Sequence, residues 1–382
     1  MWIYVVLFLL SVILYLGSSK QRKCSAKVLF ALLLLMALFV GLGDMLGGYD
    51  RYIYTELFDR VADVTHAGGD YRSTSLFKLF FKEFGYGYWN VLVSLLTRNR
   101  YIFILLTTLL VYALVFVSMM KYTNRSPLAV VLFMGLWFFF TFTYLRQVMA
   151  ASICWLAIEY AIDRKPWFFF PIVILAFFFH NSAIVFLPIY FVPIVKYNSK
   201  AVLVVMVICL GIGLSNVPSG LFNQYGEVVD VEQRVANYVS DSSGFRYAYL
   251  LEALVFLVLI LLKYDEFDEN NKTQLMLLNM SFVFCGILLI FIRSENGGRL
   301  SWFYIMGLIA TLNYLATHRQ SVSGYSAVLI AMCAILFLRI LLSWGMFLYP
   351  YKTFLTPGYR EGDQMHAKYE YDSNYDTDKL YR

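Results

Sequence analysis

The amino-acid sequence predicts an all-α protein, a polytopic transmembrane helical bundle of about 11–12 spans. Hydrophobic residues make up 60% of the chain and charged residues 15%, and a soluble domain this apolar could not cover its surface with polar groups. The apolar residues form runs of roughly 17–25 residues, the length of helix that crosses a bilayer core. These runs do not alternate polar with apolar residues, which disfavours a β-barrel.

Each apolar run is expected to form one span, with boundaries good to a few residues. The run at residues 166–196 is short for two spans and is interrupted by Pro171, Pro188 and Pro193. It predicts either a hairpin of two half-length helices or a single kinked helix, and the second alternative leaves eleven spans. The expected spans are residues 1–17, 27–43, 101–120, 127–143, 146–162, 166–180, 181–196, 200–217, 246–263, 274–292, 299–316 and 324–346.

Lys and Arg are concentrated in alternate short connections, which sets the expected orientation. The first run lacks a preceding basic segment and a small-residue cleavage site, so we interpret it as a retained span. With an even number of spans, both termini are then expected outside. The net charge of +6 is explained by these connections, and no nucleic-acid partner is expected. The connections assigned to the inner face are SSKQRKCSAK, KYTNR, DRK, KYNSK, KYDEFDENNK and THRQ.

The predicted organisation is one polytopic domain, residues 1–350, followed by a tail, residues 351–382. Two outer connections are long, residues 44–100 and 218–245. The first mixes aromatic and basic residues in YRSTSLFKLFFKEFGYGYW, which is typical of an amphipathic segment at a membrane interface. The tail is polar and rich in Tyr and Asp, so we expect it to be flexible.

The chain contains no HExxH, GxGxxG, Walker-type or GxSxG motif. Its five cysteines lack the spacing of a metal site, so neither a metal nor another cofactor is expected. Any chemistry must therefore come from polar side chains scattered along the bundle.

Two polar segments are predicted at the outer boundary of the first spans. GDMLGGYDRYIY carries Asp44, Asp50 and Arg51, and its alternative interpretation is a glycine-rich turn with a capping aspartate. YLRQVMAAS carries Arg146 and Gln147 with almost no loop around them. This favours a guanidinium that faces the bundle over one that snorkels to lipid headgroups.

Further polar groups follow in the second half of the chain. His180 lies between the two short half-helices, where it is either a functional imidazole or a structural one. Arg293 and Arg299 flank a Gly-Gly turn and form either a salt-bridged turn or a phosphate-binding pair. Arg339 lies inside the last span, where an ionisable group needs a partner or a watery cavity.

Most of these side chains share one predicted depth. A cluster rich in arginine at the outer membrane level, with acids and a histidine, fits an anionic headgroup whose lipid tail stays in the bilayer. The residues at this level are Asp44, Asp50, Arg146, His180, Arg293 and Arg299.

The segments GGYDRYIYTELF, YLRQVMAASICWLAI, FFFHNSAIVFLPIY, RLSWFY and LYPYKTF resemble signatures of the EpsG family. That family resembles Wzy-type polymerases of exopolysaccharide, capsule and O-antigen pathways, and the resemblance implies a GT-C-like arrangement of the bundle. The resemblance implies a glycosyltransferase-like polymerase in the bacterial inner membrane that joins undecaprenyl-diphosphate-linked oligosaccharide repeat units at the outer leaflet. Besides the lipid-linked substrate and the bilayer, it implies other polysaccharide assembly and chain-length proteins as partners.

Within this hypothesis, arginines stabilise the departing diphosphate and a histidine or aspartate accepts the proton of the attacking hydroxyl. The candidate bases are His180, Asp44 and Asp50. The candidate diphosphate- and substrate-binding residues are Arg146, Arg293, Arg299, Arg51, Gln147 and Arg339. A flippase or transporter of lipid-linked saccharide and a membrane acyltransferase that modifies polysaccharide remain as alternatives, since the Pro-broken helices also resemble those of transporters.

Overall fold

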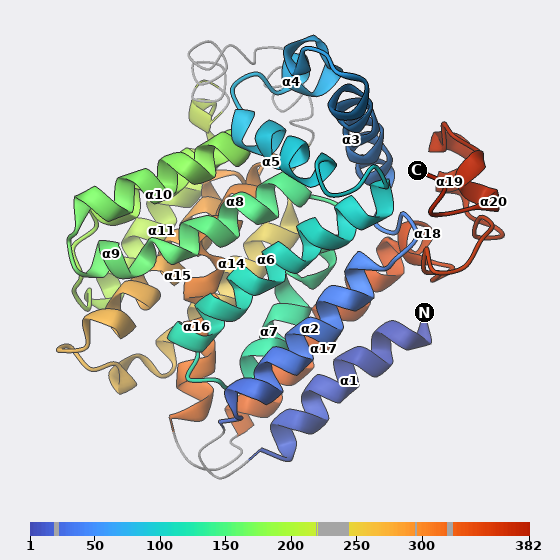
Figure 1. Ribbon diagram of the computed structural model, residues 1–382. Helices are drawn as coiled ribbons and strands as arrows, with labels where there is room; N and C mark the ends of the chain where they lie inside the picture. The colour runs from blue at the N-terminus through green and yellow to red at the C-terminus, as the bar shows by residue number, and fades with distance from the viewer. Residues whose placement is uncertain (19–22, 219, 221–243, 295, 319–323) are drawn as a thin grey trace. The chain divides into compact units, whose positions relative to one another are not determined.

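The computed structural model describes residues 1–18, 23–218, 220, 244–294, 296–318 and 324–382, so most of the outer connection 218–245 lies outside the described residues. In these ranges the regular elements are helices, and an isolated β-bridge joins Gly43 to Thr353. The protein is therefore an all-α polytopic membrane protein, as predicted (Figure 1).

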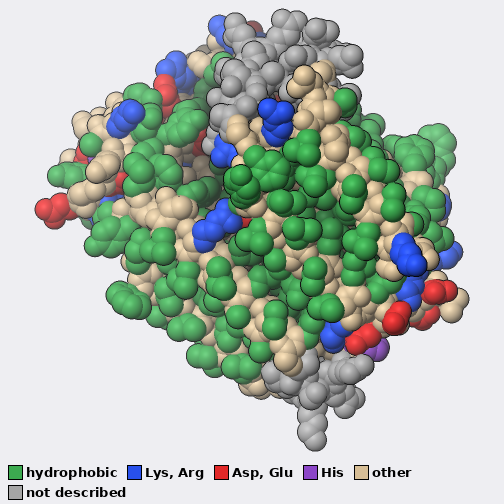
Figure 2. Space-filling model, turned by 180° about the vertical axis from the view of Figure 1, so that it is seen from behind, with side chains coloured by type: hydrophobic (Ala, Val, Ile, Leu, Met, Phe, Trp, Pro, Cys, Tyr) green, Lys and Arg blue, Asp and Glu red, His purple; other side chains and the backbone are tan. Residues whose placement is uncertain are grey.

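Every predicted span contains an apolar helix. In the described part of the chain, four are long enough to cross a bilayer: α6 (Arg100–Tyr122), α15 (Lys272–Ile290), η5 with α16 (Gly297–Thr317) and α17 (Gly324–Ser343). The shorter apolar helices are α1 (Trp2–Leu16), α2 (Ala26–Gly41), α7 (Pro127–Leu136), α8 (Leu145–Leu156), α10 (Pro166–Phe179), η3 (Asn181–Tyr190), α11 (Ser199–Leu214) and α14 (Tyr247–Leu261). Hydrophobic side chains cover most of the face seen in Figure 2, as a lipid-facing surface requires.

The remaining helices are short or lie in the connections. The first long connection folds into α3 (Tyr49–Ala67), η1 (Tyr71–Ser73), α4 (Ser75–Leu79) and α5 (Phe84–Ser94). The others are η2 (Phe138–Phe142), α9 (Ile158–Ile162), η4 (Tyr264–Glu266), α18 (Gly345–Leu348), α19 (Gln364–Tyr369) and α20 (Asn374–Thr377).

The chain forms two compact units. Unit 1 comprises Met1–Ala157, Phe170–Ile184 and Ala316–Arg382, and unit 2 comprises Ile158–Phe169 and Val185–Leu315. In unit 1, α2 packs on α6, α6 on α8, and both α1 and α17 pack on α7. In unit 2, α15 packs on α11, α14 and η5.

Helix starts in unit 1 follow from capping residues. Ser25, Asn99 and Ser126 accept hydrogen bonds from backbone N–H groups in the first turns of α2, α6 and α7. Each side-chain oxygen satisfies an N–H group that would otherwise have no partner inside the helix. Pro127 occupies the first turn of α7, where its missing N–H costs nothing.

Connections that were predicted on the same side of the membrane lie together in unit 1. The backbone N–H of Cys24, between α1 and α2, donates to the carbonyl of Arg125, between α6 and α7, over 3.0 Å. The hydroxyls of Tyr15 and Ser326 are 3.0 Å apart, which places the start of α17 at this end as well. Three connections that were predicted on the inner face therefore lie at one end of unit 1.

The predicted inner connections of unit 2 also meet. The Tyr264 hydroxyl donates to the carbonyl of Tyr197 over 2.5 Å, and Lys196 Nζ donates to the carbonyl of Phe267 over 3.2 Å. At the opposite ends of α14 and α15, the N–H of Arg246 donates to the carbonyl of Ile292 over 2.8 Å.

The Pro-containing segment forms two half-length helices, the first of the two predicted alternatives. Arg164, which precedes α10, donates hydrogen bonds to two carbonyls. One belongs to Tyr190, the last residue of η3, and the other to Val192, two residues further on. The rings of Phe169 and Tyr190 also lie 5.0 Å apart, so the chain returns to the level from which it started. Each arm is about 20 Å long at the rise of its helix type. His180, between the arms, is therefore at the turn of a hairpin.

The C-terminal segment, residues 351–382, is folded against unit 1 rather than flexible. Met365 and Tyr375 are buried in a cluster with Tyr52 of α3 and Tyr101 of α6. Lys379 forms an ion pair of 3.1 Å with Asp44, and both side chains are almost completely buried. Aromatic packing and pairing of opposite charges therefore hold a segment whose composition suggests disorder, and α19 and α20 lie close to the start of α3 (Figure 1).

Candidate functional site

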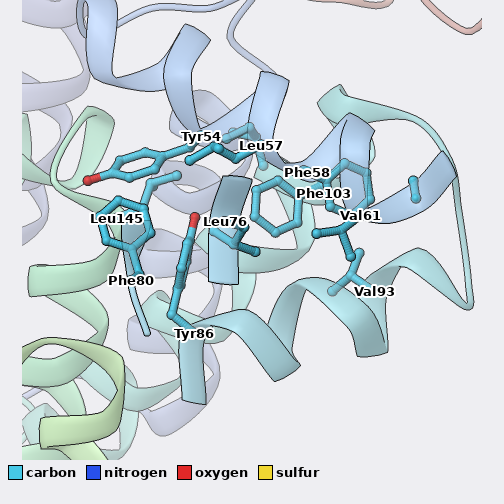
Figure 3. Close-up of a cluster of buried hydrophobic side chains, with 12 residues drawn as sticks. Tyr54, Leu57, Phe58, Val61, Leu76, Phe80, Tyr86, Val93, Phe103 and Leu145 are labelled. Atoms are coloured by element: carbon cyan, nitrogen blue, oxygen red, sulfur yellow. The ribbon is translucent and has the colours of Figure 1, made fainter. Parts of the chain in front are cut away.

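An apolar cluster in unit 1 supports the best-defined group of polar side chains. Helix α3 contributes Tyr54, Leu57, Phe58 and Val61, whose spacing puts them on one helix face. Figure 3 shows that the rings of Tyr54, Phe80 and Tyr86 gather at one end of this cluster, beside Leu145. The other members are Ala62 of α3, Leu76 of α4, Val93 of α5, and Phe103 and Ile104 of α6.

Arg146 follows Leu145 at the start of α8 and lies against the aromatic end of this cluster. Its Nη1 forms an ion pair with Glu83, its Nε donates to the Tyr54 hydroxyl over 3.3 Å, and its guanidinium lies 3.8 Å from the Phe80 ring centroid. The Arg146 side chain is 12% exposed. Among the described residues, Nη2 has no hydrogen-bond partner, so one edge of the guanidinium is open to an anion.

Glu83 connects Arg146 to the turn of the hairpin. Its second carboxylate oxygen accepts the backbone N–H of Asn181 over 3.1 Å, at the first residue of η3. A carboxylate is favoured at a helix N-terminus because unsatisfied N–H groups point outward there. Glu83 is 3% exposed, so its charge is compensated by Arg146 and by this N–H rather than by water.

His180 is oriented by Ser182. The Nδ1 atom accepts the backbone N–H of Ser182 over 3.2 Å and lies 2.6 Å from the Ser182 hydroxyl. Because a backbone N–H can only donate, we assign the proton of the neutral imidazole to Nε2. The amide oxygen of the neighbouring Asn181 is buried and accepts no hydrogen bond from the described residues.

Asp50 lies one helical turn before Tyr54 on α3, so both side chains are on the same side of the helix. Its carboxylate, together with partial burial, raises the pKa of the adjacent Tyr49 hydroxyl. Helix α3 starts in this position because Gly47 and Gly48 have φ values of 114° and 106°. A Cβ at Gly47 would lie 2.7 Å from the carbonyl oxygen of Phe142, so only glycine fits.

Asp44 and Arg51 have structural contacts. Arg51 is completely buried, and its guanidinium donates to the carbonyls of Gly43 over 3.3 Å and Val40 over 2.9 Å. Val40 lies in the last turn of α2 and Gly43 follows the helix, so Arg51 satisfies acceptors at a helix C-terminus. Asp44 is held by Lys379, as described above.

The other predicted residues have different surroundings within their own units. Gln147 is buried in α8, and Arg339 is on the exposed face of α17, which also carries Ile335 and Leu342. Arg293 and Arg299 belong to unit 2, where Arg293 donates to the carbonyl of Leu214 over 3.4 Å and Arg299 contacts Asn296. In the described parts of the chain, no group of three or more His, Cys, Asp or Glu side chains could hold a metal ion.

The site thus combines predicted and unpredicted residues. Arg146, His180 and Asp50 are brought into one unit. Two residues that the sequence alone does not mark link Arg146 to its surroundings, since Tyr54 connects it to α3 and Glu83 connects it to Asn181 at the turn of the hairpin. The available signal for Glu83 is that it is the only carboxylate in the aromatic stretch SLFKLFFKEFGYGYW.

A family model with the description EpsG family matches residues 27–353. The chain belongs to the EpsG family. EpsG is a Wzy-type exopolysaccharide polymerase family, so the protein has an exopolysaccharide-related polymerase function. The group formed by Arg146 and its surroundings is called the Arg146 cluster below, and it consists of Tyr54, Phe80, Glu83, Arg146, His180, Asn181 and Ser182. The EpsG match includes every residue of this cluster and stops before α19 and α20. No curated protein and no solved structure matches the chain.

Proposed function

We propose that this EpsG protein is a glycosyltransferase that joins undecaprenyl-diphosphate-linked oligosaccharide repeat units at the outer leaflet of the bacterial inner membrane. The observation that carries the proposal is the Arg146 guanidinium, which is held by Glu83 and Tyr54 with one open edge. A fixed, partly desolvated guanidinium suits a diphosphate, because its charge is permanent and its donors are planar.

In the proposed step, a hydroxyl oxygen of the incoming lipid-linked unit attacks the anomeric carbon of the growing chain. A new C–O bond forms while the bond from that carbon to the diphosphate oxygen breaks. The electron pair leaves with undecaprenyl diphosphate, and the hydroxyl proton passes to a base. Arg146 stabilises the charge that develops on the leaving group, a contribution that typically amounts to about 10²–10³ in rate for one donor.

Asp50 is the base that the contacts favour. Asp44 is engaged with Lys379 and buried, and His180 carries its proton on Nε2 in the assigned tautomer. His180 is therefore better suited to donate a hydrogen bond to a phosphate oxygen, with Ser182 fixing its ring. Asp50 is partly exposed and shares a face of α3 with Tyr54.

The other predicted contacts remain part of the proposal. Arg293 and Arg299 on unit 2 are candidates for binding phosphate of the same class of lipid. Both termini are proposed to lie outside, where chain-length and other assembly proteins would meet the polymerase. No metal or other cofactor is included, since the proposed leaving group needs only cationic side chains.

The test combines a deletion strain with purified protein. Deletion should stop polymer formation and leave single lipid-linked repeats accessible at the outer leaflet, and the purified protein should join those repeats into polymer. A repeat confined to the inner leaflet would instead indicate a flippase. Full-length polymer that lacks acyl groups would indicate an acyltransferase, and either result would overturn the proposal.

A further inference from the structure

The start of α3 and the end of α19 form an aromatic surface outside the Arg146 cluster. The ring centroids of Tyr49 and Tyr369 are 5.7 Å apart, and Tyr369 also lies 6.4 Å from Tyr52. Tyr52 is buried and supports this surface, whereas Tyr49 is 49% exposed. An exposed Tyr49 ring and a partly buried Tyr369 ring beside the Asp50 carboxylate suit a saccharide, because C–H groups pack on aromatic faces while hydroxyls donate to the carboxylate.

Tyr369 is held in place by a buried ion pair of the next residue along the chain. The adjacent Glu370 accepts from Arg100 over 2.9 Å, and both side chains are at most 5% exposed. Arg100 also pairs with Asp59 of α3. Ion pairs of this kind contribute little net stability but specify one arrangement, since leaving either charge unpaired is costly. The ring of Tyr369 is therefore pre-positioned beside Tyr49 before any ligand binds.

The aromatic surface and the Arg146 cluster are connected through α3. Tyr49 and Asp50 precede Tyr54, the residue that contacts Arg146, by about one helical turn, or roughly 6–8 Å along the axis. That distance is similar to the length of one sugar residue. A saccharide on Tyr49 and Tyr369 would therefore place a terminal hydroxyl close to a diphosphate at Arg146.

We infer that the C-terminal segment, residues 354–382, completes the acceptor-saccharide site, with Tyr369 and Tyr49 stacking on a sugar of the incoming repeat unit. The inference rests on the proposed polymerase function and deepens it. The EpsG match stops at residue 353, so Tyr369 and its anchor Glu370 come from a part of the chain that the family model does not describe. This segment is accordingly where the protein adapts a shared polymerase site to its own repeat unit.

The experiment measures binding and turnover separately. The probe for binding is the oligosaccharide released by mild acid from lipid-linked repeats of the deletion strain, titrated against the full-length protein in nanodiscs. Tyr369→Ala should weaken this binding about 3- to 10-fold, which is the change in affinity expected when one aromatic contact is lost. It should raise the KM for the lipid-linked acceptor by a similar factor with kcat unchanged. Tyr371→Ala is the matched control, because Tyr371 is 60% exposed two residues further on.

Tyr369→Leu guards against misfolding, because it keeps an apolar contact with Tyr52 and removes the aromatic face. Wild-type affinity and KM in Tyr369→Leu or Tyr369→Ala would overturn the inference, as would equal losses in Tyr371→Ala. Failure of the wild-type protein to bind the oligosaccharide would also overturn it. A wild-type protein that binds the oligosaccharide but forms no polymer would refute the proposed function and leave the binding surface intact.

Discussion

Replacing Glu83 by Gln tests whether Arg146 is held by a buried charge pair. Gln keeps the shape and can still accept the Asn181 N–H, but it leaves the guanidinium without a counter-charge. Removing one partner of a buried pair typically costs about 3–5 kcal/mol. We expect about 3 kcal/mol here, at the lower end of that range, because Arg146 is 12% exposed and keeps some hydration. Polymer formation should fall about 10²-fold, since in the proposed step a displaced guanidinium would no longer meet the diphosphate.

The assay is reversible unfolding in mixed detergent and SDS micelles, followed by in vitro polymerisation normalised to folded protein. Glu56→Gln is the control, because Glu56 pairs with Arg60 on the exposed side of α3, where such pairs are worth at most about 1 kcal/mol. The double variant Glu83→Gln, Arg146→Met should lose less stability than the two single losses added together. A Glu83→Gln protein as stable and active as Glu56→Gln would refute the argument.

Three further predictions concern the site and the topology. Arg146→Lys keeps the charge but loses the planar fork, so polymer should drop about 10²–10³-fold at normal membrane abundance, and full polymer from both Arg146→Lys and Arg146→Ala would remove this residue from the site. His180→Gln should remain folded yet slow transfer about 10²–10³-fold, because the hydrogen bond that Nε2 donates to the phosphate in the proposed function is displaced, whereas a silent His180→Gln beside a poorly expressed His180→Leu would indicate a structural role. Cys24 should react with thiol reagents only from the cytoplasmic side, and a reporter attached after Arg382 through a flexible linker should be outside; a cytoplasmic reporter would contradict the proposed orientation.

The spans could be predicted from the sequence because the signal is local. An apolar run of sufficient length forms a helix in the bilayer whatever its neighbours are, since backbone groups must pair within the segment. Only the segment around Pro171 and Pro188 left two alternatives, because proline breaks a helix without specifying the direction that follows. The contact of Arg164 with the carbonyls of Tyr190 and Val192 distinguishes them.

The site was predictable only in part, because its contacts join residues far apart in the chain. Arg146 and His180 stood out as polar residues in apolar surroundings, but Glu83 looked like one more charge in a connecting loop. It meets Arg146 across 63 positions and Asn181 across 98. Arg51 shows the opposite case, since its charge suggested a ligand site while its actual contacts are carbonyls at the end of α2.

Composition also misled for the C-terminal segment. Its Tyr, Asp and Lys residues resemble those of a disordered tail, because sequence alone does not show whether a charge has a partner. Lys379 pairs with Asp44, shortly before α3, and Glu370 pairs with Arg100 at the start of α6. In both pairs the partner precedes the C-terminal residue by hundreds of positions. Such pairing depends on the tertiary fold and leaves no local pattern.

The hairpin between Arg164 and Val192 has a consequence for the bilayer around the protein. Its arms are about 20 Å long, whereas the hydrocarbon core is about 30 Å thick. With its base at one boundary, the turn at His180 stops roughly 10 Å short of the other. The bilayer next to the turn must then become thinner, or the lipids there must tilt, so that the polar groups of the turn do not face hydrocarbon. In the proposed function, the headgroup of a lipid-linked substrate would then reach Arg146 from the side instead of being lifted out of the membrane, and hydrophobic mismatch would itself help to load the substrate.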